Sequence, residues 1–274
     1  MKKLGFIGGG NMAEALARGL VERKIFKPAE LIVSDVDAGR RRKINRALKI
    51  AVTDDNLEVV RESRAVLLAV KPQQIDEVLT GVAAADRNLH LQDKLFISIA
   101  AGITIVRLTG ALGAKARVIR VMPNAPAMVG RGMAALVRSK GASKNDEAFA
   151  LRIFLAVGDA VALKDEALLD PVTALSGSGP AYVYLFVKAL ADAAANEGIP
   201  RDLAIRMALK TVEGAEYNMR MSKLQPEELI RIVASRGGTT EAALKRFAAA
   251  GFSDIVAAAV HAAADRSREL GRNF

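Results

Sequence analysis

The alternation of short apolar runs with amphipathic stretches over residues 1–163 is the feature that most constrains this chain. Such a pattern is typical of strands joined by crossover helices along a mostly parallel sheet. The predicted strands are Leu4–Ile7, Leu31–Ser34, Ala65–Val70, Leu95–Ile99, Arg117–Val121, Met133–Val137 and Ala160–Leu163. The predicted helices are Asn11–Glu22, Ala38–Leu48, Leu57–Glu62, Gln74–Ala84, Ile103–Leu112 and Asp146–Val157.

After Leu163 the strand signals stop, and the remaining sequence has helical period and a high alanine content. Glycine and proline interrupt it at SGSGP (176–180), at 198–200, at 225–226 and at 237–238. A length of 274 residues allows one large domain or two ordinary ones. The change of pattern favours two: an α/β domain over residues 1–163 and an all-α domain over residues 164–274.

The amino-acid composition excludes several kinds of chemistry. The chain is 51% hydrophobic but only 4% aromatic, so alanine, valine, leucine and isoleucine must fill the interior. It has no cysteine, which excludes disulfides, thiolate catalysis and cysteine-bound metal, and no histidine or carboxylate cluster has metal-ligand spacing. We therefore expect no metal, and any redox chemistry must come from an organic cofactor. No apolar run approaches the roughly 20 residues of a membrane span, and the N-terminus lacks a signal-peptide pattern. The expectation is a cytoplasmic protein with no membrane partner.

The net charge of +10 is unevenly distributed. Residues 1–163 carry 26 Lys and Arg against 16 Asp and Glu, whereas residues 164–274 carry 14 against 14. A basic half suits either nucleic acid or a polyanionic dinucleotide. No aromatic side chains are interleaved with the basic ones to stack on bases, so the dinucleotide is favoured and no nucleic-acid partner is expected.

A glycine-rich turn follows the first predicted strand. The sequence Gly8-Gly9-Gly10-Asn11-Met12-Ala13 has the G-x-G-x-x-A spacing of a Rossmann dinucleotide-binding turn. Gly8 permits the tight turn, Gly10 leaves space for a pyrophosphate, and Ala13 lets the helix approach the sheet. We predict Gly8, Gly10, Asn11 and Met12 as cofactor contacts; the alternative is a plain strand–helix turn.

The end of the second strand bears on which nicotinamide cofactor is bound. Asp35 suits the ribose hydroxyls of NAD, while Ser34 and the run Arg40-Arg41-Arg42-Lys43 suit the additional phosphate of NADP. We predict NADPH with Ser34 as a contact, with NADH also possible. The alternative for the cation run is a solvated helix face.

Two further strand ends carry candidate cofactor contacts, because parallel sheets bind ligands at the carboxyl ends of their strands. The run Ala65–Val70 is followed by Lys71-Pro72, which makes Ala69 and Lys71 candidates. Asn124 follows the strand that ends at Val121. A lysine that merely flanks the next helix, and an asparagine in a simple turn, are the structural alternatives.

Seven segments in order resemble the pyrroline-5-carboxylate reductase family: GFIGGGNMAEA, LLAVKPQ, ISIAAGIT, RVIRVMPNAPAMVGRG, TALSGSGPAYVYLF, ASRGGTTEAAL and GFSDIVAAAVHAAADRSRELG. The resemblance implies a Rossmann-type N-terminal domain and an all-α C-terminal dimerisation domain, with the active site at the interface of a homodimer. Assembly of dimers into larger rings is also possible. It implies that Asn56 contacts the cofactor ribose.

By the same resemblance, the catalytic segment is Ser235-Arg236-Gly237-Gly238-Thr239-Thr240. It implies that Thr240 donates a hydrogen bond to the substrate ring nitrogen, and that Ser235, Gly237, Gly238, Thr239 and also Ser178 bind substrate. Physically, two glycines before a helix expose N–H groups suited to a carboxylate. Without the resemblance, Thr239 or Thr240 would be interpreted as a helix N-cap. The family usually has proline where this chain has Arg236.

The predicted function is NADPH-dependent reduction of 1-pyrroline-5-carboxylate to L-proline, the last step of proline biosynthesis. One alternative is a β-hydroxyacid-dehydrogenase-like enzyme, but that chemistry needs a lysine as general acid and TALSGSGPAY has none. The other is a non-catalytic dinucleotide-binding sensor, which only the change at Arg236 favours.

Overall fold

The computed structural model describes residues 1–84 and 90–273, and it divides the chain into two compact units. One unit comprises Met1–Ser178 together with Ala262–Phe274, and the other comprises Gly179–His261. The division between the units falls later than the predicted domain boundary at residue 163, because the segment after the last strand packs with the sheet. The assignment of functions to residues 1–163 and 164–274 remains a prediction.

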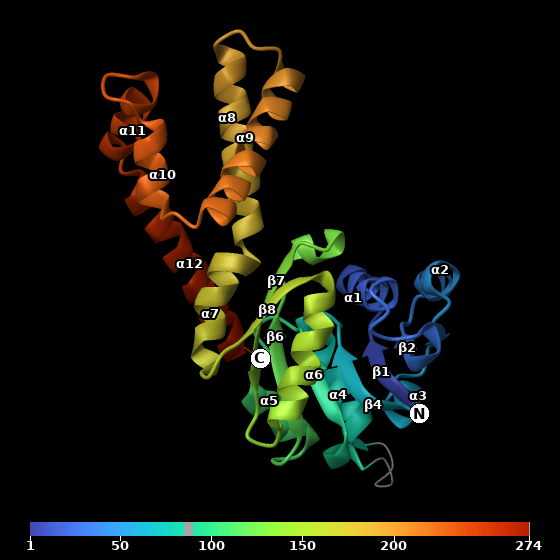
Figure 1. Ribbon diagram of the computed structural model, residues 1–274. Helices are drawn as coiled ribbons and strands as arrows, with labels where there is room; N and C mark the ends of the chain where they lie inside the picture. The colour runs from blue at the N-terminus through green and yellow to red at the C-terminus, as the bar shows by residue number, and fades with distance from the viewer. Residues whose placement is uncertain (85–89, 274) are drawn as a thin grey trace. The chain divides into compact units, whose positions relative to one another are not determined.

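An eight-stranded sheet forms the first unit (Figure 1), in the order β3-β2-β1-β4-β5-β6-β7-β8. Neighbouring strands are parallel except β6 and β7, which are antiparallel. The strand order reverses direction between β1 and β4, which is the position where doubly wound sheets bind ligands. The strands are β1 (Lys2–Ile7), β2 (Leu31–Ser34), β3 (Ala51–Thr53), β4 (Ser63–Leu68), β5 (Leu95–Ser98), β6 (Arg117–Met122), β7 (Gly132–Arg138) and β8 (Gly158–Ala162).

Helices cover both faces of this sheet (Figure 1). Along β1, Leu4 and Phe6 join one buried cluster and Ile7 joins the other, as expected when successive side chains point to opposite faces. The α-helices of the sheet unit are α1 (Asn11–Glu22), α2 (Ala38–Leu48), α3 (Asn56–Glu62), α4 (Ile75–Ala84), α5 (Ile105–Leu112), α6 (Lys144–Phe154) and α7 (Leu169–Val172). A single π-helical turn, η8 (Thr173–Gly177), follows α7, and short 3-10 turns join several other elements.

The predicted mostly parallel sheet is therefore confirmed, and α1 and α2 begin and end at the predicted residues. One strand is missing from the prediction. β3 has only three residues, all half-buried, so it shows neither a continuous apolar run nor an alternating pattern. It forms because Ala51–Thr53 pair in parallel with Ile32–Ser34 of the neighbouring strand β2.

Two glycines let β7 and β8 pair closely. Gly158 lies opposite Gly132 in the register, and a Cβ on Gly158 would overlap the backbone of Gly132. Replacing Gly158 by alanine is expected to lower the free energy of unfolding by about 3 kcal/mol, because two backbones must separate. Urea unfolding measures this loss. The control is Gly110→Ala, since a Cβ there meets no atom within 4 Å in an exposed helix; an equal loss in both variants would contradict the steric account.

A buried carboxylate fastens α6 to β6. Asp146 accepts two hydrogen bonds from Arg117 and two from Ser143, whose N–H and hydroxyl lie 2.8 and 2.9 Å from its Oδ2. Burial raises the pKa of Asp146, but the hydrogen bonds from Arg117 and Ser143 together outweigh burial and hold the pKa below its usual value. The folded state therefore favours the charged form of this carboxyl.

Asp146→Asn is expected to lower the free energy of unfolding at neutral pH by about 2 kcal/mol, less than a fully buried pair because Arg117 is partly exposed. Because the pKa of Asp146 is lowered in the folded state, the carboxylate contributes to the free energy of unfolding in a pH-dependent way. Its contribution is fully present above the unfolded pKa of about 3.9 and is lost as pH falls through the folded value. When the wild type and Asp146→Asn are unfolded at a series of pH values, the difference between their free energies of unfolding should shrink below about pH 4. A difference that grows on acidification contradicts this, and the exposed Asp159→Asn is the control.

The second unit is entirely helical, as predicted for this part of the chain. Its helices are α8 (Gly179–Asn196), α9 (Arg201–Ser222), α10 (Pro226–Val233), α11 (Thr239–Ala249) and the first part of α12 (Phe252–Asn273). Ala191, Ala204 and Ala208 pack α8 against α9 as a small buried core. Many large apolar side chains remain exposed, among them Tyr184, Leu185, Ile232, Val233 and Ile255, each more than 60% exposed. Exposed apolar surface on this scale is typical of a protein interface.

Among residues 1–84 and 90–273, no single helix has the length and apolarity that crossing a bilayer requires. The bent pair Thr239–Ala249 and Phe252–Arg272 together has that length and composition.

Candidate active site

The turn after β1 is built by two glycines with different tasks. Gly8 has φ +95°, and a Cβ there would lie 2.8 Å from the Ala69 carbonyl oxygen, so the turn requires glycine. A Cβ on Gly10 would meet no atom within 4 Å. Helix α1 begins at Asn11 with Gly10 as its N-cap, and no side chain caps it. Its first N–H groups are thus available to an anion.

This turn opens onto a cavity of about 470 Å³ at the carboxyl ends of β1, β2 and β4. The position is the one at which doubly wound sheets hold dinucleotides. The lining residues are Gly8, Gly10, Asp35, Val36, Asp55, Asn56, Leu57, Ala69, Val70, Lys71, Gln74, Glu77, Val78, Gly81 and Val82.

Five predicted cofactor residues come together in this cavity: Gly8, Gly10, Asn56, Ala69 and Lys71. Lys71 is the one lysine or arginine among these lining residues. It is exposed and makes no ion pair with any residue in 1–84 or 90–273.

The predicted residues Asn11 and Met12 do not line the cavity with their side chains. Asn11 accepts a hydrogen bond from Arg40, and Met12 packs against the apolar core beneath the sheet. Any contact of these two residues with a ligand would be through their backbone N–H groups at the start of α1.

Ser34 ends β2 with its side chain fully buried. Its hydroxyl donates to the Asn56 Oδ1 at 2.6 Å and lies 3.3 Å from the Phe6 carbonyl of β1. The hydrogen bond with Asn56 fixes the Asn56 amide oxygen, and the Asn56 NH₂ group has no protein partner among the described residues. The contact of Ser34 with a cofactor phosphate stays a prediction.

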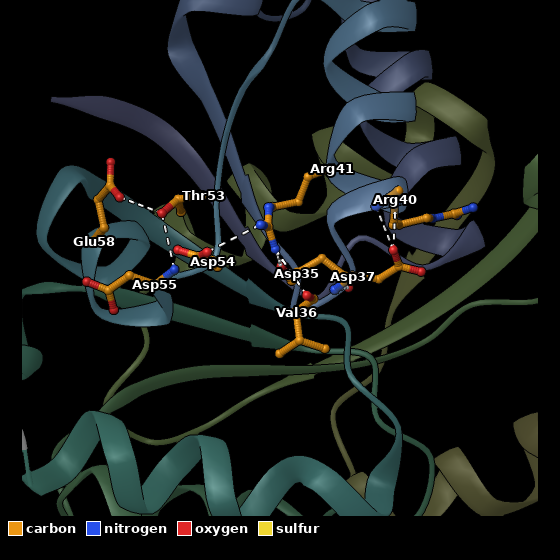
Figure 2. A network of polar contacts seen from close by, with 10 residues as sticks. Asp35, Val36, Asp37, Arg40, Arg41, Thr53, Asp54, Asp55 and Glu58 are labelled. Atoms are coloured by element: carbon orange, nitrogen blue, oxygen red, sulfur yellow. Dashed lines mark hydrogen bonds and ion pairs between the residues drawn. The ribbon is translucent and has the colours of Figure 1, made fainter.

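Asp35 and Arg41 organise the turn after β2 (Figure 2). The Asp35 carboxylate accepts from the N–H groups of Gly9 and Asp37, each at 2.8 Å. Arg41 donates to the backbone carbonyls of Asp35 and Val36 and pairs with Asp54 at 3.2 Å. Asp35 therefore lines the cavity with its carboxylate fixed, and Arg41 is fixed against the backbone of the same turn.

Arg40 fastens the glycine turn from the other side. Its guanidinium donates to the carbonyl of Gly9 and to the Asn11 side chain, and it pairs with Glu14 at 3.1 Å. Burial raises the pKa of Glu14, but hydrogen bonds from Lys43 and Arg18 outweigh burial and lower it. Of the predicted cation run, Arg40 and Arg41 thus hold the two turns, Lys43 pairs with Glu14 of α1 at 3.0 Å, and Arg42 is exposed on α2.

Asn124 follows the end of β6; it is nearly buried and does not line the cavity. Its amide donates to the Ser176 carbonyl at 2.9 Å and accepts from the Met133 N–H at 2.8 Å. Both ends of the side chain thus bind protein groups, each through one hydrogen bond. The contact of Asn124 with a nicotinamide or substrate stays a prediction.

The predicted catalytic loop precedes α11 in the second unit. Thr240 is the second residue of the helix, whose N-cap is Gly238 without any side-chain cap. The sequence predicts exposed glycine N–H groups in this loop, but in the structure both have protein acceptors. Gly237 donates to the Glu241 carboxylate at 2.5 Å, and Gly238 donates to the Ser235 carbonyl at 3.0 Å. The hydrogen bond from Gly237, followed by that from Lys245, lowers the pKa of Glu241.

Ser178, the remaining predicted substrate residue, ends the π-helical turn of the first unit and donates its N–H to Thr173. Several cavity residues were not predicted from the sequence, among them Gln74, which ends the 3-10 turn η2 (Pro72–Gln74), and Glu77 on α4. The signal for them was the Lys71-Pro72 start of a helix directly after a strand end, since this start brings the first turns of α4 beside the crevice.

Comparison with known proteins decides the family. A family profile described as pyrroline-5-carboxylate reductase dimerisation matches residues 166–270, and one described as NADP oxidoreductase, coenzyme F420-dependent, matches residues 3–102. The chain is 41% identical to pyrroline-5-carboxylate reductase of Pseudomonas aeruginosa, over 99% of this chain and 98% of the relative. The Synechocystis reductase is 40% identical over 98% of each chain. The chain belongs to the pyrroline-5-carboxylate reductase family.

Solved structures of pyrroline-5-carboxylate reductases agree with this. The reductase from Coxiella burnetii superposes with a TM-score of 0.92 at 31% identity, covering 98% of each chain. The Plasmodium falciparum reductase, solved with NADP bound, superposes with a TM-score of 0.86 at 31% identity and the same coverage. The resemblance inferred from sequence motifs is therefore confirmed, as is the fold that it implied.

Proposed function

We propose that this chain reduces 1-pyrroline-5-carboxylate to L-proline with NADPH as the reductant, NADH also being accepted. The observation that carries the proposal is the glycine turn at a strand end, where an uncapped helix N-terminus opens onto a 470 Å³ cavity. Family membership supplies the substrate, since relatives that are about 40% identical over almost the whole chain carry the name of this reaction.

The residues present fit a dinucleotide. The space over Gly10 and the free N–H groups of α1 suit the pyrophosphate, and the Lys71 ammonium adds a positive charge. The NH₂ group of Asn56 suits a ribose hydroxyl. The fixed Arg41 at the β2 end suits the additional phosphate of NADP, and the adjacent Asp35 suits the ribose of NAD, which is why both cofactors are proposed.

The reaction adds one hydride and one proton across a C=N bond. When bound, NADPH supplies the hydride to the imine carbon, and the ring nitrogen carries the proton in the product. The proposed role of Thr240 is to donate its hydroxyl hydrogen bond to that nitrogen. The remaining contribution of the protein is to hold the imine carbon about 3 to 3.5 Å from the hydride donor atom.

The proposed carboxylate site is the loop Ser235–Thr239. The loop already binds one carboxylate, since Gly237 donates to Glu241. The substrate carboxylate would take the N–H groups of Thr239 and Thr240 at the uncapped start of α11, together with the hydroxyls of Ser235 and Thr239. Ser178 is proposed as a further contact on the substrate.

The proposed assembly is a homodimer formed through residues 164–274, with larger rings of dimers as a further possibility. The apolar exposure on α8, α9, α10 and α12 supports it, because a helical unit with so small a core of its own needs a partner. The dimerisation profile over residues 166–270 covers the same helices. We place the protein in the cytoplasm.

Loss of NADPH absorbance on addition of 1-pyrroline-5-carboxylate, with proline formed in equal amount, tests the proposal. The same assay with NADH gives the cofactor preference. If the protein bound NADPH or NADH but oxidised neither, the proposal would be wrong and the chain would be a dinucleotide-binding sensor.

A further inference from the structure

The π-helical turn η8 leaves one backbone carbonyl without its ordinary helical partner. In an α-helix, a carbonyl accepts from the N–H four residues later, and for Ser176 that residue is Pro180, which has no N–H. The five-residue bond of the π-helical turn runs from the Ser178 N–H to the Thr173 carbonyl and not to Ser176. The Ser176 hydroxyl does not compensate, because it donates back to the Val172 carbonyl at 3.1 Å. A half-buried carbonyl left in this state is destabilising.

Asn124 supplies the missing donor from a distant part of the chain. Its Nδ2 donates to the Ser176 carbonyl at 2.9 Å, and its Oδ1 accepts from the Met133 N–H at 2.8 Å. The two bonds fix the orientation of the amide, since only one end of it donates. A single side chain therefore joins the end of β6, the start of β7 and η8.

A second contact holds the same segments together. A Cβ on Gly177 would lie 2.7 Å from the Met122 Cε, so the π-helical turn passes directly over the last residue of β6. The chain then enters α8 at Gly179. The Asn124 amide and the glycine contact together determine where the chain leaves the sheet unit.

We infer that Asn124 is a positioning residue that ties the SGSGP segment to the end of β6 by satisfying the carbonyl that Pro180 leaves without a donor. The consequence for catalysis rests on the proposed function, in which Ser178 of this segment contacts substrate. On that basis Asn124 acts on the turnover of the imine acid and not on the binding of NADPH.

Asn124→Asp is the informative variant, because it has nearly the same shape and retains the acceptor for the Met133 N–H while removing the donor to Ser176. We expect kcat for imine reduction to fall on the order of 10- to 100-fold, as for small misplacements of a reacting group. The Kd for NADPH, measured by titration, is expected to stay within about twofold, since a contact outside the site adds little to binding. Asn145→Asp makes the same chemical change at an exposed position and serves as the control.

Pro180→Ala gives the second arm of the test, because alanine restores an N–H four residues after Ser176. In this background the loss caused by Asn124→Asp should be on the order of fivefold smaller than in the wild type. Equal losses in both backgrounds would overturn the inference. So would a rise in the NADPH Kd that matches the fall in kcat/KM, since it would make Asn124 a direct cofactor contact.

The four proteins of this cycle are also compared by urea unfolding, which needs no turnover. If the effects of Asn124→Asp and Pro180→Ala on the unfolding midpoint are not additive, the link between Asn124 and the Ser176 carbonyl is supported. This holds even if the wild type fails to reduce 1-pyrroline-5-carboxylate, in which case only the proposed function is lost. If the two effects on the unfolding midpoint are additive, the inferred link is overturned, even if the wild type is fully active.

Discussion

Replacing Thr240 by alanine is expected to lower kcat for the reduction of 1-pyrroline-5-carboxylate on the order of 100-fold, which is typical for loss of a group that donates to the reacting atom. The hydroxyl sits on the first turn of α11, where the helix has no side-chain cap. The change therefore removes a donor for the substrate and not a helix cap, so stability should change little. Steady-state rates with saturating NADPH measure the effect.

Two companions make the Thr240 result decisive. Thr240→Ser retains the hydroxyl and should restore most of the rate. Thr211→Ala removes a threonine hydroxyl that only bonds the Met207 carbonyl on an exposed helix face, so it should be close to neutral. If Thr240→Ala retained the wild-type kcat while its unfolding midpoint fell, the threonine would be a structural N-terminal residue of α11 and the proposed catalytic role would be wrong.

Gly10→Val is expected to raise the Kd for NADPH at least 100-fold while leaving the fold intact, which corresponds to a loss of about 3 kcal/mol of binding free energy. The backbone of Gly10 is extended, with φ −61° and ψ 178°, so a side chain is tolerated there. That side chain would occupy the space over the N-terminus of α1 instead of touching protein, since nothing lies within 4 Å of its Cβ. Fluorescence titration with NADPH gives the Kd, and thermal unfolding checks the fold.

The matched control is Gly110→Val, where the Cβ also meets open space but on the exposed face of α5, away from the cavity. Unchanged NADPH affinity in Gly10→Val would show that the pyrophosphate does not lie over this turn. Equal losses of affinity in both variants would point to a general effect of valine at glycine positions.

Features that depend on local sequence were predictable. The G-x-G-x-x-A spacing located the turn, and the helices Asn11–Glu22 and Ala38–Leu48 followed from periodicity; in the structure their N-caps are Gly10 and Asp37. The Asp37 side chain caps α2 through the N–H groups of Gly39 and Arg40, a contact spanning only two and three residues. Short-range signals of this kind are present in the sequence itself.

Features that depend on distant partners were not predictable. The sequence shows Ser34 and Asn124 as polar residues at strand ends, and nothing local indicates that their partners are Asn56, Met133 and Ser176. In the catalytic loop, the glycine N–H groups were predicted to be free, but Glu241 reaches back one helical turn to take the first of them. The contacts of these polar residues within the protein thus depend on packing, and their contacts with a ligand stay predictions.

Hydride transfer from the cofactor to the imine carbon is the central claim, and isotope labelling tests it most directly. The protein is supplied with 1-pyrroline-5-carboxylate and NADPH that carries deuterium at the transferable position, and the proline formed is analysed by mass spectrometry and NMR. The account predicts one deuterium per proline, located on the former imine carbon. Proline without deuterium, or no proline while NADPH remains bound and unoxidised, would contradict it.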